Sequence, residues 1–495
     1  MSELKTIVKQ SSNMTIFWIL ATFIGFFSNI IYTRYLPKDV FGDFTLMRTI
    51  INLFAIYAMF GLNHGFLRQG SLALGREQPE VYKEIQNYTI TVSLIISLVV
   101  CAIVFFCAGP ISTYIFKKPS ITNLVRFCSF VIPIQLIGNM TLVLFKVNKK
   151  ADTGQFLYTI LYFVLQLAFF YLLTFFLKDE PLIIISFIVA NFIYLIILLY
   201  YQKKFKVKYS LKLEKKEKKA LYNISVPMFF AATFSQSQRW GDTLFLGILG
   251  TNAQVGVYYI ALRISSFISI PQNAFTQIFL PIAGRLMGKG KHEELNDLYK
   301  TITRLIFISG SLIFGVIYFM QSYLLSMFGH FYQNASVVLI YLLISETVDF
   351  GVGPAKELIT MSGGGKINLI NSIITLAINI AGSYLLIPHY GIIGAAIANA
   401  LTNISMNLIA VIELIIIYKL SPFNIKYFVI IAIFILCLIG TNYLPVIDIS
   451  KAICFGVVLT SIYIFGVLNK EEKDLFINMI KRRSKKLKNK IEANN

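Results

Sequence analysis

The chain has 495 residues, of which 56% are hydrophobic and only 14% are charged. No soluble core needs so much apolar side chain, so the composition excludes an ordinary soluble protein and predicts an all-α integral membrane protein with many spans. The formal net charge is +21. Its meaning depends on where the basic residues lie, and we expect no nucleic-acid partner.

Apolar segments of about 20 residues, the length that crosses a bilayer as a helix, predict about fourteen transmembrane helices. The first six lie near 14–36, 43–66, 86–108, 121–145, 155–177 and 181–201. Six more lie near 221–249, 256–284, 302–328, 331–358, 367–387 and 391–418, and a final pair near 426–445 and 450–468.

This order predicts two six-helix bundles, a linker, an extra helix pair and a tail. The parts are an N-terminal bundle (1–202), a basic cytoplasmic linker (203–220), a C-terminal bundle (221–420), an additional transmembrane pair (421–469) and a basic cytoplasmic tail (470–495). A weak internal repeat supports the two bundles, since Phe41-Gly42 matches Val255-Gly256 at the first short turn of each half. Because each copy has an even number of helices, both copies have the same orientation in the membrane.

The loops predict the orientation. With the N-terminus inside, Lys and Arg accumulate in the cytoplasmic segments, above all in 203–219 and 470–490, as the positive-inside rule requires. We therefore expect a multi-pass protein of the plasma (inner) membrane with both termini in the cytoplasm. The basic segments are explained by topology and by attraction to anionic lipid.

The stretch 226–256 places charge inside a helix that would otherwise suit the membrane. Ser235, Arg239 and Asp242 lie at i, i+4 and i+7, so they share one helical face. A charge at mid-bilayer costs roughly 2.5–3.5 kcal/mol, so such a face needs protein or water around it. Either Arg239 and Asp242 form an internal ion pair, or they line a cavity for a charged substrate.

Arginines in corresponding helices of the two halves are the strongest candidates for ligand contact. Arg48 and Arg263 each follow the short turn of their half, where they could converge on one anion. The planar guanidinium donates two parallel hydrogen bonds to a phosphate and stays charged at any relevant pH. Asn52 shares the helical face of Arg48. For any single polar residue, however, hydrogen bonding between helices is the simpler explanation.

Glu346 and Asp349 lie one turn apart in the predicted tenth span. Carboxylates inside a membrane often bind protons or sodium ions, so these two are candidate ion-coupling residues. They could instead balance the charges of Arg239 and Arg263. The five cysteines lie in apolar runs without metal-ligand spacing, and we expect no metal site, no catalytic residue and no cofactor beyond a coupling proton or sodium ion.

Several segments resemble a known family. They are Arg34-Tyr-Leu-Pro-Lys-Asp-Val-Phe-Gly42, the stretch from Val226-Pro227 to Asp242-Thr-Leu-Phe-Leu-Gly247, Val255-Gly-Val-Tyr-Tyr-Ile-Ala-Leu-Arg263, and Leu386-Ile-Pro-His-Tyr-Gly-Ile-Ile-Gly-Ala-Ala-Ile-Ala398. In their order and spacing they resemble the polysaccharide exporters, or lipid-linked oligosaccharide flippases of the O-antigen (Wzx) type. That family belongs to the multidrug/oligosaccharidyl-lipid/polysaccharide exporter (MOP) superfamily.

The resemblance implies a V-shaped pair of bundles that alternates access and carries a polyprenyl-diphosphate-linked oligosaccharide to the outer leaflet. It places arginines on the diphosphate, which fits Arg48 and Arg263, with Arg34 as a further contact. Membrane lipids and other polysaccharide-assembly proteins are the further partners it implies.

Two other functions compete with a non-enzymatic flippase. An ion-coupled exporter of drugs or metabolites is one, although cationic drugs would favour acidic and aromatic walls over paired arginines. A membrane glycosyltransferase or polymerase is the other, although the predicted external loops are all short.

Overall fold

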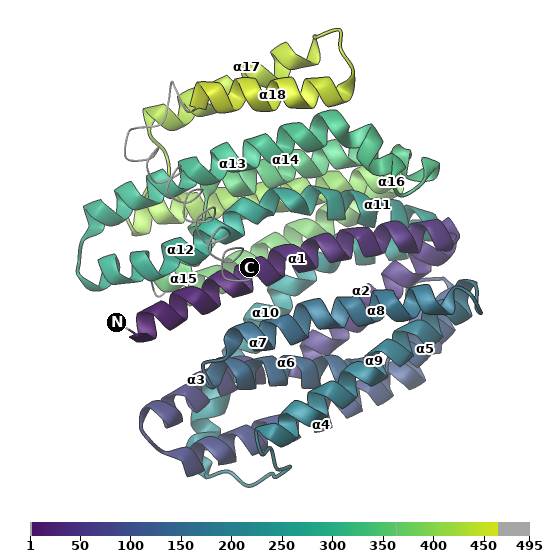
Figure 1. Ribbon diagram of the computed structural model, residues 1–495, viewed down its shortest axis with the longest axis vertical. Helices are drawn as coiled ribbons and strands as arrows, with labels where there is room; N and C mark the ends of the chain where they lie inside the picture. The colour runs from purple at the N-terminus through teal and green to yellow at the C-terminus, as the bar shows by residue number, and fades with distance from the viewer. Residues whose placement is uncertain (1, 363, 464–495) are drawn as a thin grey trace, which may run out of the picture.

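The computed structural model describes residues 2–362 and 364–463, and the regular elements in these ranges are all helical (Figure 1). The predicted all-α membrane class is confirmed. The tail 470–495 and the end of the last predicted span lie outside the described residues.

Residues 2–204 form one run of helices. They are α1 (Ser2–Tyr35), α2 (Lys38–Met59), α3 (Leu62–Gly75), α4 (Pro79–Pro110), the π-helix η1 (Ile111–Ile115), the 3-10 helix η2 (Pro119–Ile121), α5 (Thr122–Cys128), α6 (Val131–Val147), α7 (Ala151–Gln155), the π-helix η3 (Phe156–Leu161), α8 (Tyr162–Leu173) and α9 (Asp179–Lys204).

The remaining helices begin after the lysine-rich segment. They are α10 (Lys215–Leu249), α11 (Asn252–Ser265), the 3-10 helix η4 (Ser266–Ile268), α12 (Ser269–Gly288), α13 (His292–Ser326), the 3-10 helix η5 (His330–Ala335), α14 (Ser336–Val352), α15 (Ala355–Met361), α16 (Gly365–Ile417), α17 (Ile425–Asn442) and α18 (Asp448–Ile462).

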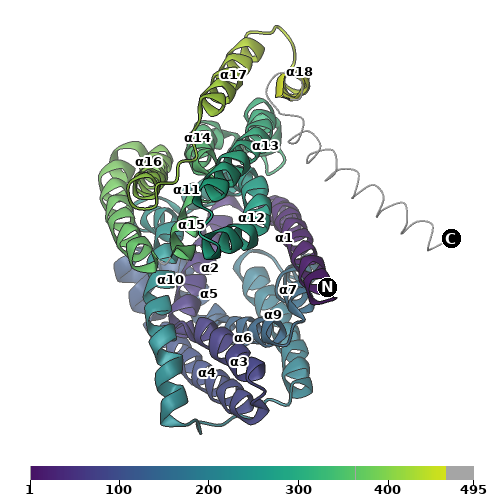
Figure 2. The same cartoon turned by 90° about the vertical axis from the view of Figure 1, so that its left-hand side faces the viewer.

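The helices form two groups that lie side by side. Figures 1 and 2 show α2–α9 in one group and α11–α16 in the other, with α17 and α18 at the far edge beside α13. Helices α1 and α10 lie on opposite sides between the groups and contact both: α1 packs on α7, α8, α11 and α12, and α10 packs on α2, α3 and α16.

The two groups are joined most closely where α2 packs on α11. A Cβ atom at Gly42 would lie 1.8 Å from the backbone oxygen of Asn252, so only glycine permits this approach. Phe41 packs beside the contact, with its ring centroid 6.4 Å from that of Tyr259. The short turns matched by the sequence repeat are therefore in direct contact.

Several predicted spans are bent or broken. The predicted span 43–66 is divided at Phe60 and Gly61, and α5 and α6 meet at 45°. Helix α14 ends at Val352 and α15 begins at Ala355, on either side of Pro354. In α16 the backbone turns sharply at Gly391 (φ 57°, ψ −128°), a conformation that glycine adopts without strain.

Ten helices of the described chain are long and apolar enough to cross a membrane, or eleven if the bent α5–α6 pair counts as one span. The count of fourteen is not confirmed and stays a prediction. Three elements account for the difference between eleven and fourteen. The long α16 contains two predicted spans but counts once, and α10 carries a polar run and is not among the ten. Helix α18 has only 15 residues within the part of the chain that the structure describes.

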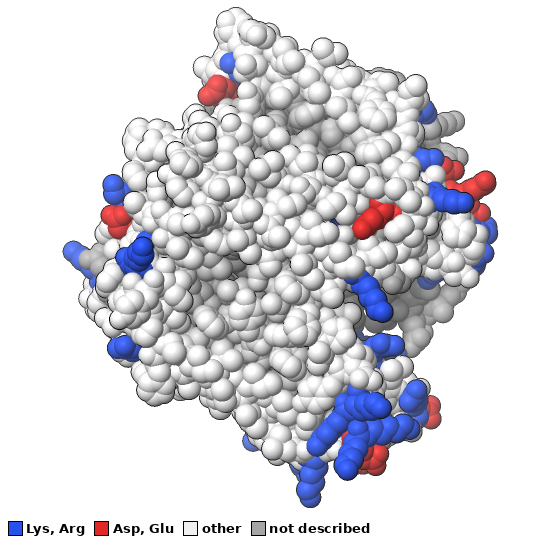
Figure 3. All heavy atoms as spheres, turned by 180° about the vertical axis from the view of Figure 1, so that it is seen from behind, with Lys and Arg blue, Asp and Glu red and all other residues white. Residues whose placement is uncertain are grey.

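The surface is consistent with a membrane environment. Figure 3 shows a broad band free of charged side chains, with Lys and Arg gathered mainly toward the right and lower right of the view and few at the left. Large apolar side chains remain exposed, such as Phe106 at 77% and Ile416 at 71%. In water such a surface would be unstable, whereas lipid chains cover it without cost.

Candidate functional site

Arg48 and Arg263 line the same small hollow between the two groups of helices. Each arginine lies about two turns beyond the glycine at the α2–α11 contact, so the close packing of these helices directs both side chains to one place. The rest of the wall comes from α1 and α8 and consists of Gly25, Ser28, Asn29, Tyr32, Phe163 and Gln166. The convergence expected of this pair is therefore present in the fold.

The hollow is basic, and some of the polar atoms around it lack hydrogen-bond partners. None of its lining residues is Asp or Glu. The Nε of Arg263 is buried without a hydrogen-bond partner, as is the Oδ1 of Asn29. A buried donor on a charged group that lacks a partner is costly. The hollow has no room for a water molecule in this conformation, so an acceptor can reach Arg263 only when the helices around it move apart.

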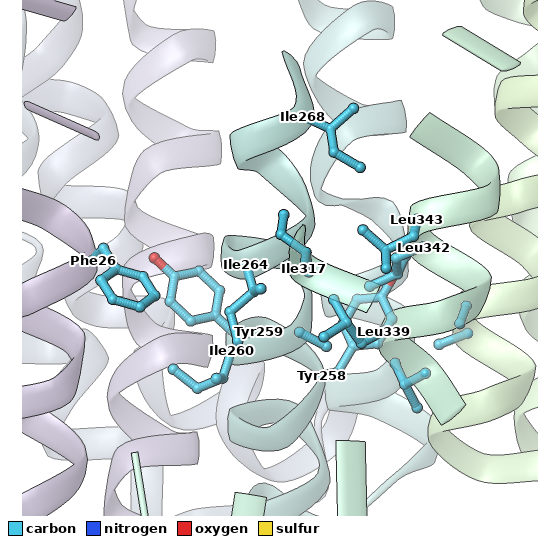
Figure 4. Close-up of a cluster of buried hydrophobic side chains, with 14 of the residues drawn as sticks. Phe26, Tyr258, Tyr259, Ile260, Ile264, Ile268, Ile317, Leu339, Leu342 and Leu343 are labelled. Carbon is cyan, nitrogen blue, oxygen red and sulfur yellow. The ribbon is translucent and has the colours of Figure 1, made fainter. Parts of the chain in front are cut away.

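Each of the two guanidinium groups lies near an aromatic ring. The Arg48 Cζ lies 5.3 Å from the centroid of the Phe44 ring, and the Arg263 Cζ lies 5.9 Å from that of Tyr259. Figure 4 shows that Tyr259 points from α11 toward Phe26 of α1, whereas its neighbour Tyr258 points to the other side of the helix, toward α14. Of these adjacent tyrosines, Tyr259 therefore lies beside Arg263 of the hollow, and Tyr258 lies in the interior of the second group.

Asp242 is buried in a polar cluster of the second group. It is 1% exposed and accepts hydrogen bonds from the Tyr258 hydroxyl at 3.1 Å, from Asn379 Nδ2 at 2.6 Å and from Asn399 Nδ2 at 2.6 Å. Its hydrogen bonds thus come from these neutral donors rather than from Arg239. Asp242 does not line the hollow, and its carboxylate oxygens already accept hydrogen bonds from residues of the second group.

The three residues predicted to share one face of α10 have different environments. Ser235 and Arg239 are exposed, whereas Asp242 is buried. Between Ser225 and Gly241 the helix buries no residue, because this part crosses from one group of helices to the other. The sequence predicted that the three residues share a helical face, but it did not predict which helices pack against each part of α10.

Asp349 lies in an ion pair of the same half. Its Oδ1 accepts from Lys356 Nζ at 2.7 Å and from Asn407 Nδ2 at 2.9 Å. Glu346 lies one turn away, within electrostatic range of Asp349, Lys356 and Arg239. The structure therefore gives Asp349 a lysine counter-charge instead of Arg239 or Arg263, and ion coupling by this pair stays a prediction.

The other two candidate residues lie outside the hollow. Arg34 is exposed and hydrogen-bonds the carbonyl oxygens of Met327 and Ser326 at the end of α13. Asn52 lies one turn from Arg48 and lines a neighbouring cavity, where its Oδ1 accepts from Gln135 Nε2 at 3.2 Å. The structure thus brings Arg48 and Asn52 together, but not Arg34.

Sequence reasoning missed Asn29, Tyr32 and Gln166 of the hollow. Asn29 and Gln166 are polar residues within long apolar runs. Such residues in a span usually face the protein interior or a water-filled cavity, and that signal was available in the sequence.

The fold is similar to those of solved membrane transporters. A structure described as the lipid II flippase MurJ in an inward closed conformation matches with a TM-score of 0.73 at 14% identity, over 91% of this chain and 98% of that one. An inward-facing multidrug resistance MATE family transporter of the MOP superfamily matches with a TM-score of 0.64 at 15% identity, over 79% and 92%. The helices and the buried polar site thus define a multi-pass membrane protein with the MurJ and MATE fold.

Comparison of the sequence with family models identifies the family of the chain. A family model described as "Polysaccharide biosynthesis protein" matches residues 31–337. The chain belongs to this polysaccharide biosynthesis protein family, and the predicted resemblance is confirmed at the level of that family.

Two curated relatives come from Haloferax volcanii. The probable low-salt glycan biosynthesis flippase Agl15 is 24% identical over 192 residues, which are 38% of this chain and 40% of the relative. The probable flippase AglR is 27% identical over 186 residues, which are 35% and 37%. The chain thus matches about two fifths of the length of these relatives.

Proposed function

We propose that the protein is a flippase that moves a polyprenyl-diphosphate-linked oligosaccharide from the cytoplasmic to the outer leaflet, for assembly of a cell-surface polysaccharide or glycan. One observation carries this proposal. Arg48 and Arg263 come from different halves of the chain and line one hollow without a carboxylate. Paired guanidinium groups suit a diphosphate, because each can donate two parallel hydrogen bonds to phosphate oxygens.

The position of the two arginines suits alternating access. The hollow has walls from α2 and α11, which belong to different groups of helices. An anion between them stabilises the arrangement in which both guanidinium groups face it. Relative movement of the groups changes that contact, so binding and movement are linked energetically.

The mechanism needs no chemical step and no cofactor. The arginines neutralise the diphosphate, the sugars cross in a polar environment, and the prenyl tail stays in lipid. A proton or sodium ion is the proposed coupling ion, with Glu346 and Asp349 as the residues to test. The proposed location is the plasma (inner) membrane with both termini cytoplasmic, and other polysaccharide-assembly proteins are proposed partners.

The second candidate is an ion-coupled exporter of drugs or metabolites, which the similarity to a MATE transporter favours. The lining of the hollow favours the flippase, because a basic site attracts anions and repels the cationic compounds such an exporter would carry. Drug susceptibility of cells that express the protein distinguishes the two.

The direct test is native mass spectrometry of the full-length protein. The probes are a polyprenyl-diphosphate oligosaccharide, a polyprenyl monophosphate and an ordinary phospholipid. We expect preferential retention of the diphosphate glycolipid, and its loss in Arg48→Ala and Arg263→Ala. Arg126→Ala is the matched control, because Arg126 is also half-buried and stacks near an aromatic ring, Phe105, but does not line the hollow. Equal retention of the three lipids by the wild type would reject the flippase.

A further inference from the structure

A cavity of about 190 Å³ adjoins the hollow on the side of the N-terminal group. Its wall is formed by residues of α2, α6, η3, α8 and α9. Arg48 and Phe163 line both the cavity and the hollow. The cavity is therefore the free space that directly adjoins Arg48 on the side of the N-terminal group.

The lining combines aromatic faces with neutral polar groups. Tyr158, Tyr162 and Tyr194 contribute rings, while Asn52 and Gln135 contribute amides. Arg48 is the only charged residue in the lining, so the cavity does not suit a cation. A sugar ring has an apolar C–H face, which packs on aromatic rings, and a rim of hydroxyls, which bonds to amides and phenols.

Tyr194 lines the cavity and has a buried hydroxyl without a hydrogen-bond partner. It is 2% exposed, and its hydroxyl has no hydrogen-bond partner. Its ring packs edge-on to Tyr162, with centroids 5.3 Å apart. A buried hydroxyl without a partner is unfavourable, so the Tyr194 hydroxyl is free to hydrogen-bond a polar group that enters the cavity.

The backbone beside the cavity is also unusual. The π-helix η3, Phe156–Leu161, interrupts the otherwise α-helical run from α7 to α8 and contains Tyr158 and Thr159. A π-turn is rare and is frequently found at functional sites. Here it helps to place Tyr158, Thr159 and, just beyond it, Tyr162 in the wall of the cavity.

We infer that this cavity binds the sugar residue bonded directly to the diphosphate, while Arg48 and Arg263 hold the diphosphate itself. The inference rests on the proposed function and names the part of the substrate that the N-terminal group recognises. Pockets for drug-sized ligands measure roughly 300–1,000 Å³. The smaller volume here has room for one sugar ring, so the rest of the oligosaccharide extends outside the cavity.

The experiment compares binding of two kinds of probe to the purified full-length protein. One is farnesyl diphosphate, and the other is farnesyl diphosphate that carries a single glucose, N-acetylglucosamine or glucuronic acid. The ratio of their dissociation constants isolates the contribution of the sugar. We expect tighter binding of at least one glycosylated probe by the wild type.

Two variants test the cavity. Tyr194→Phe removes only the unpaired hydroxyl, and we expect it to reduce the sugar contribution roughly two- to tenfold, the value of one hydrogen bond. Thr159→Phe fills the cavity from its half-buried wall and should remove the sugar contribution altogether. Both variants should bind farnesyl diphosphate as the wild type does, which also shows that they are folded.

Tyr332→Phe is the matched control. Tyr332 is 3% exposed and its hydroxyl also lacks a partner, but it lies in η5, away from the cavity. If wild type binds farnesyl diphosphate but gains nothing from any of the three sugars, the cavity inference is overturned and the flippase proposal stands. If farnesyl diphosphate itself binds no better than a phospholipid, both fail. An equal effect of Tyr332→Phe and Tyr194→Phe would also overturn the inference.

Discussion

Arg34, in the last turn of α1, donates from Nε to the backbone oxygen of Met327 at 3.0 Å. Its Nη2 also reaches the oxygen of Ser326 at 3.3 Å. The last carbonyl groups of a helix have no partner within it, and they carry the negative end of the helix dipole. A guanidinium therefore caps α13 and connects it to the end of α1.

Removing this cap should loosen the contact between α1 and α13. In Arg34→Gln we expect amide hydrogen exchange around residues 327–333 to rise by a factor of roughly two to ten, because two hydrogen bonds from a charged donor are lost. Hydrogen–deuterium exchange measured by mass spectrometry checks this. Unchanged exchange in Arg34→Gln would show that the contact does not stabilise this arrangement.

The Asp242 cluster should contribute strongly to stability. Asp242→Ala leaves the amides of Asn379 and Asn399 without their acceptor in a buried site, and each loss costs roughly 1–3 kcal/mol. We expect a clear fall in the unfolding temperature in detergent. A double-mutant cycle with Asn399→Ala should show that the two losses are not additive, since they break the same bond.

Additive losses of stability in the Asp242→Ala and Asn399→Ala cycle would show that the two side chains do not interact. Arg239→Ala is a suitable comparison, because Arg239 is exposed and lies one turn from Asp242 on the same helix. We expect it to leave the unfolding temperature nearly unchanged.

Gly42→Ala should separate α2 from α11. The added Cβ would lie 1.8 Å from the Asn252 backbone oxygen, and backbone cannot move aside as the end of a long side chain can. Overpacking of this kind typically costs about 1–3 kcal/mol. Thermal unfolding of the purified variants measures the effect. Gly75→Ala is the control, because nothing lies within 4 Å of a Cβ at that position, and equal stabilities would show that the α2–α11 contact is not tight.

Lys118, in the loop between η1 and η2, should make stability depend on pH above neutrality. Burial disfavours its ammonium and lowers the pKa of Lys118 to about 8 from 10.5, although Asp43 partly opposes the shift. The folded protein therefore binds this proton less tightly than the unfolded chain. Stability should rise as pH increases from about 8 to 10.5 and be independent of this group below pH 8.

The variant Lys118→Met should lose this pH dependence and be more stable than the wild type near pH 7. Unfolding temperatures of both proteins from pH 7 to 10 provide the measurement. A parallel pH profile in the two proteins would contradict the assignment to Lys118. Lys117→Met, which removes the exposed neighbouring lysine, is the control.

Much of the candidate site follows from features visible in the sequence. The short turns with Gly42 and Gly256 occur at matching places in the two halves, and Arg48 and Arg263 follow each of them by a similar number of residues. Once the halves pack through these glycines, the arginines necessarily lie close together. Local spacing and an internal repeat were sufficient for this part.

Other parts depend on contacts that no local pattern encodes. The partners of Asp242 include Asn379 and Asn399, which are remote in the sequence, so the ion pair with Arg239 was an equally reasonable interpretation. The π-helix η3 arises from one extra residue in a turn, and its sequence looks like that of any apolar span. Hydropathy also overlooks the bends at Phe60 and Gly391, because a bent helix and a straight one have the same composition.

The contact between α2 and α11 also affects how the protein is made. The ribosome synthesises α2 long before α11, so Arg48 enters the bilayer without Tyr259 and Arg263 beside it. Until the second half is inserted, neighbouring N-terminal helices, water or lipid headgroups must satisfy this charge. Completion of the hollow lined by Arg48 and Arg263 is therefore a late step of biogenesis, and chains truncated before α11 will lack it.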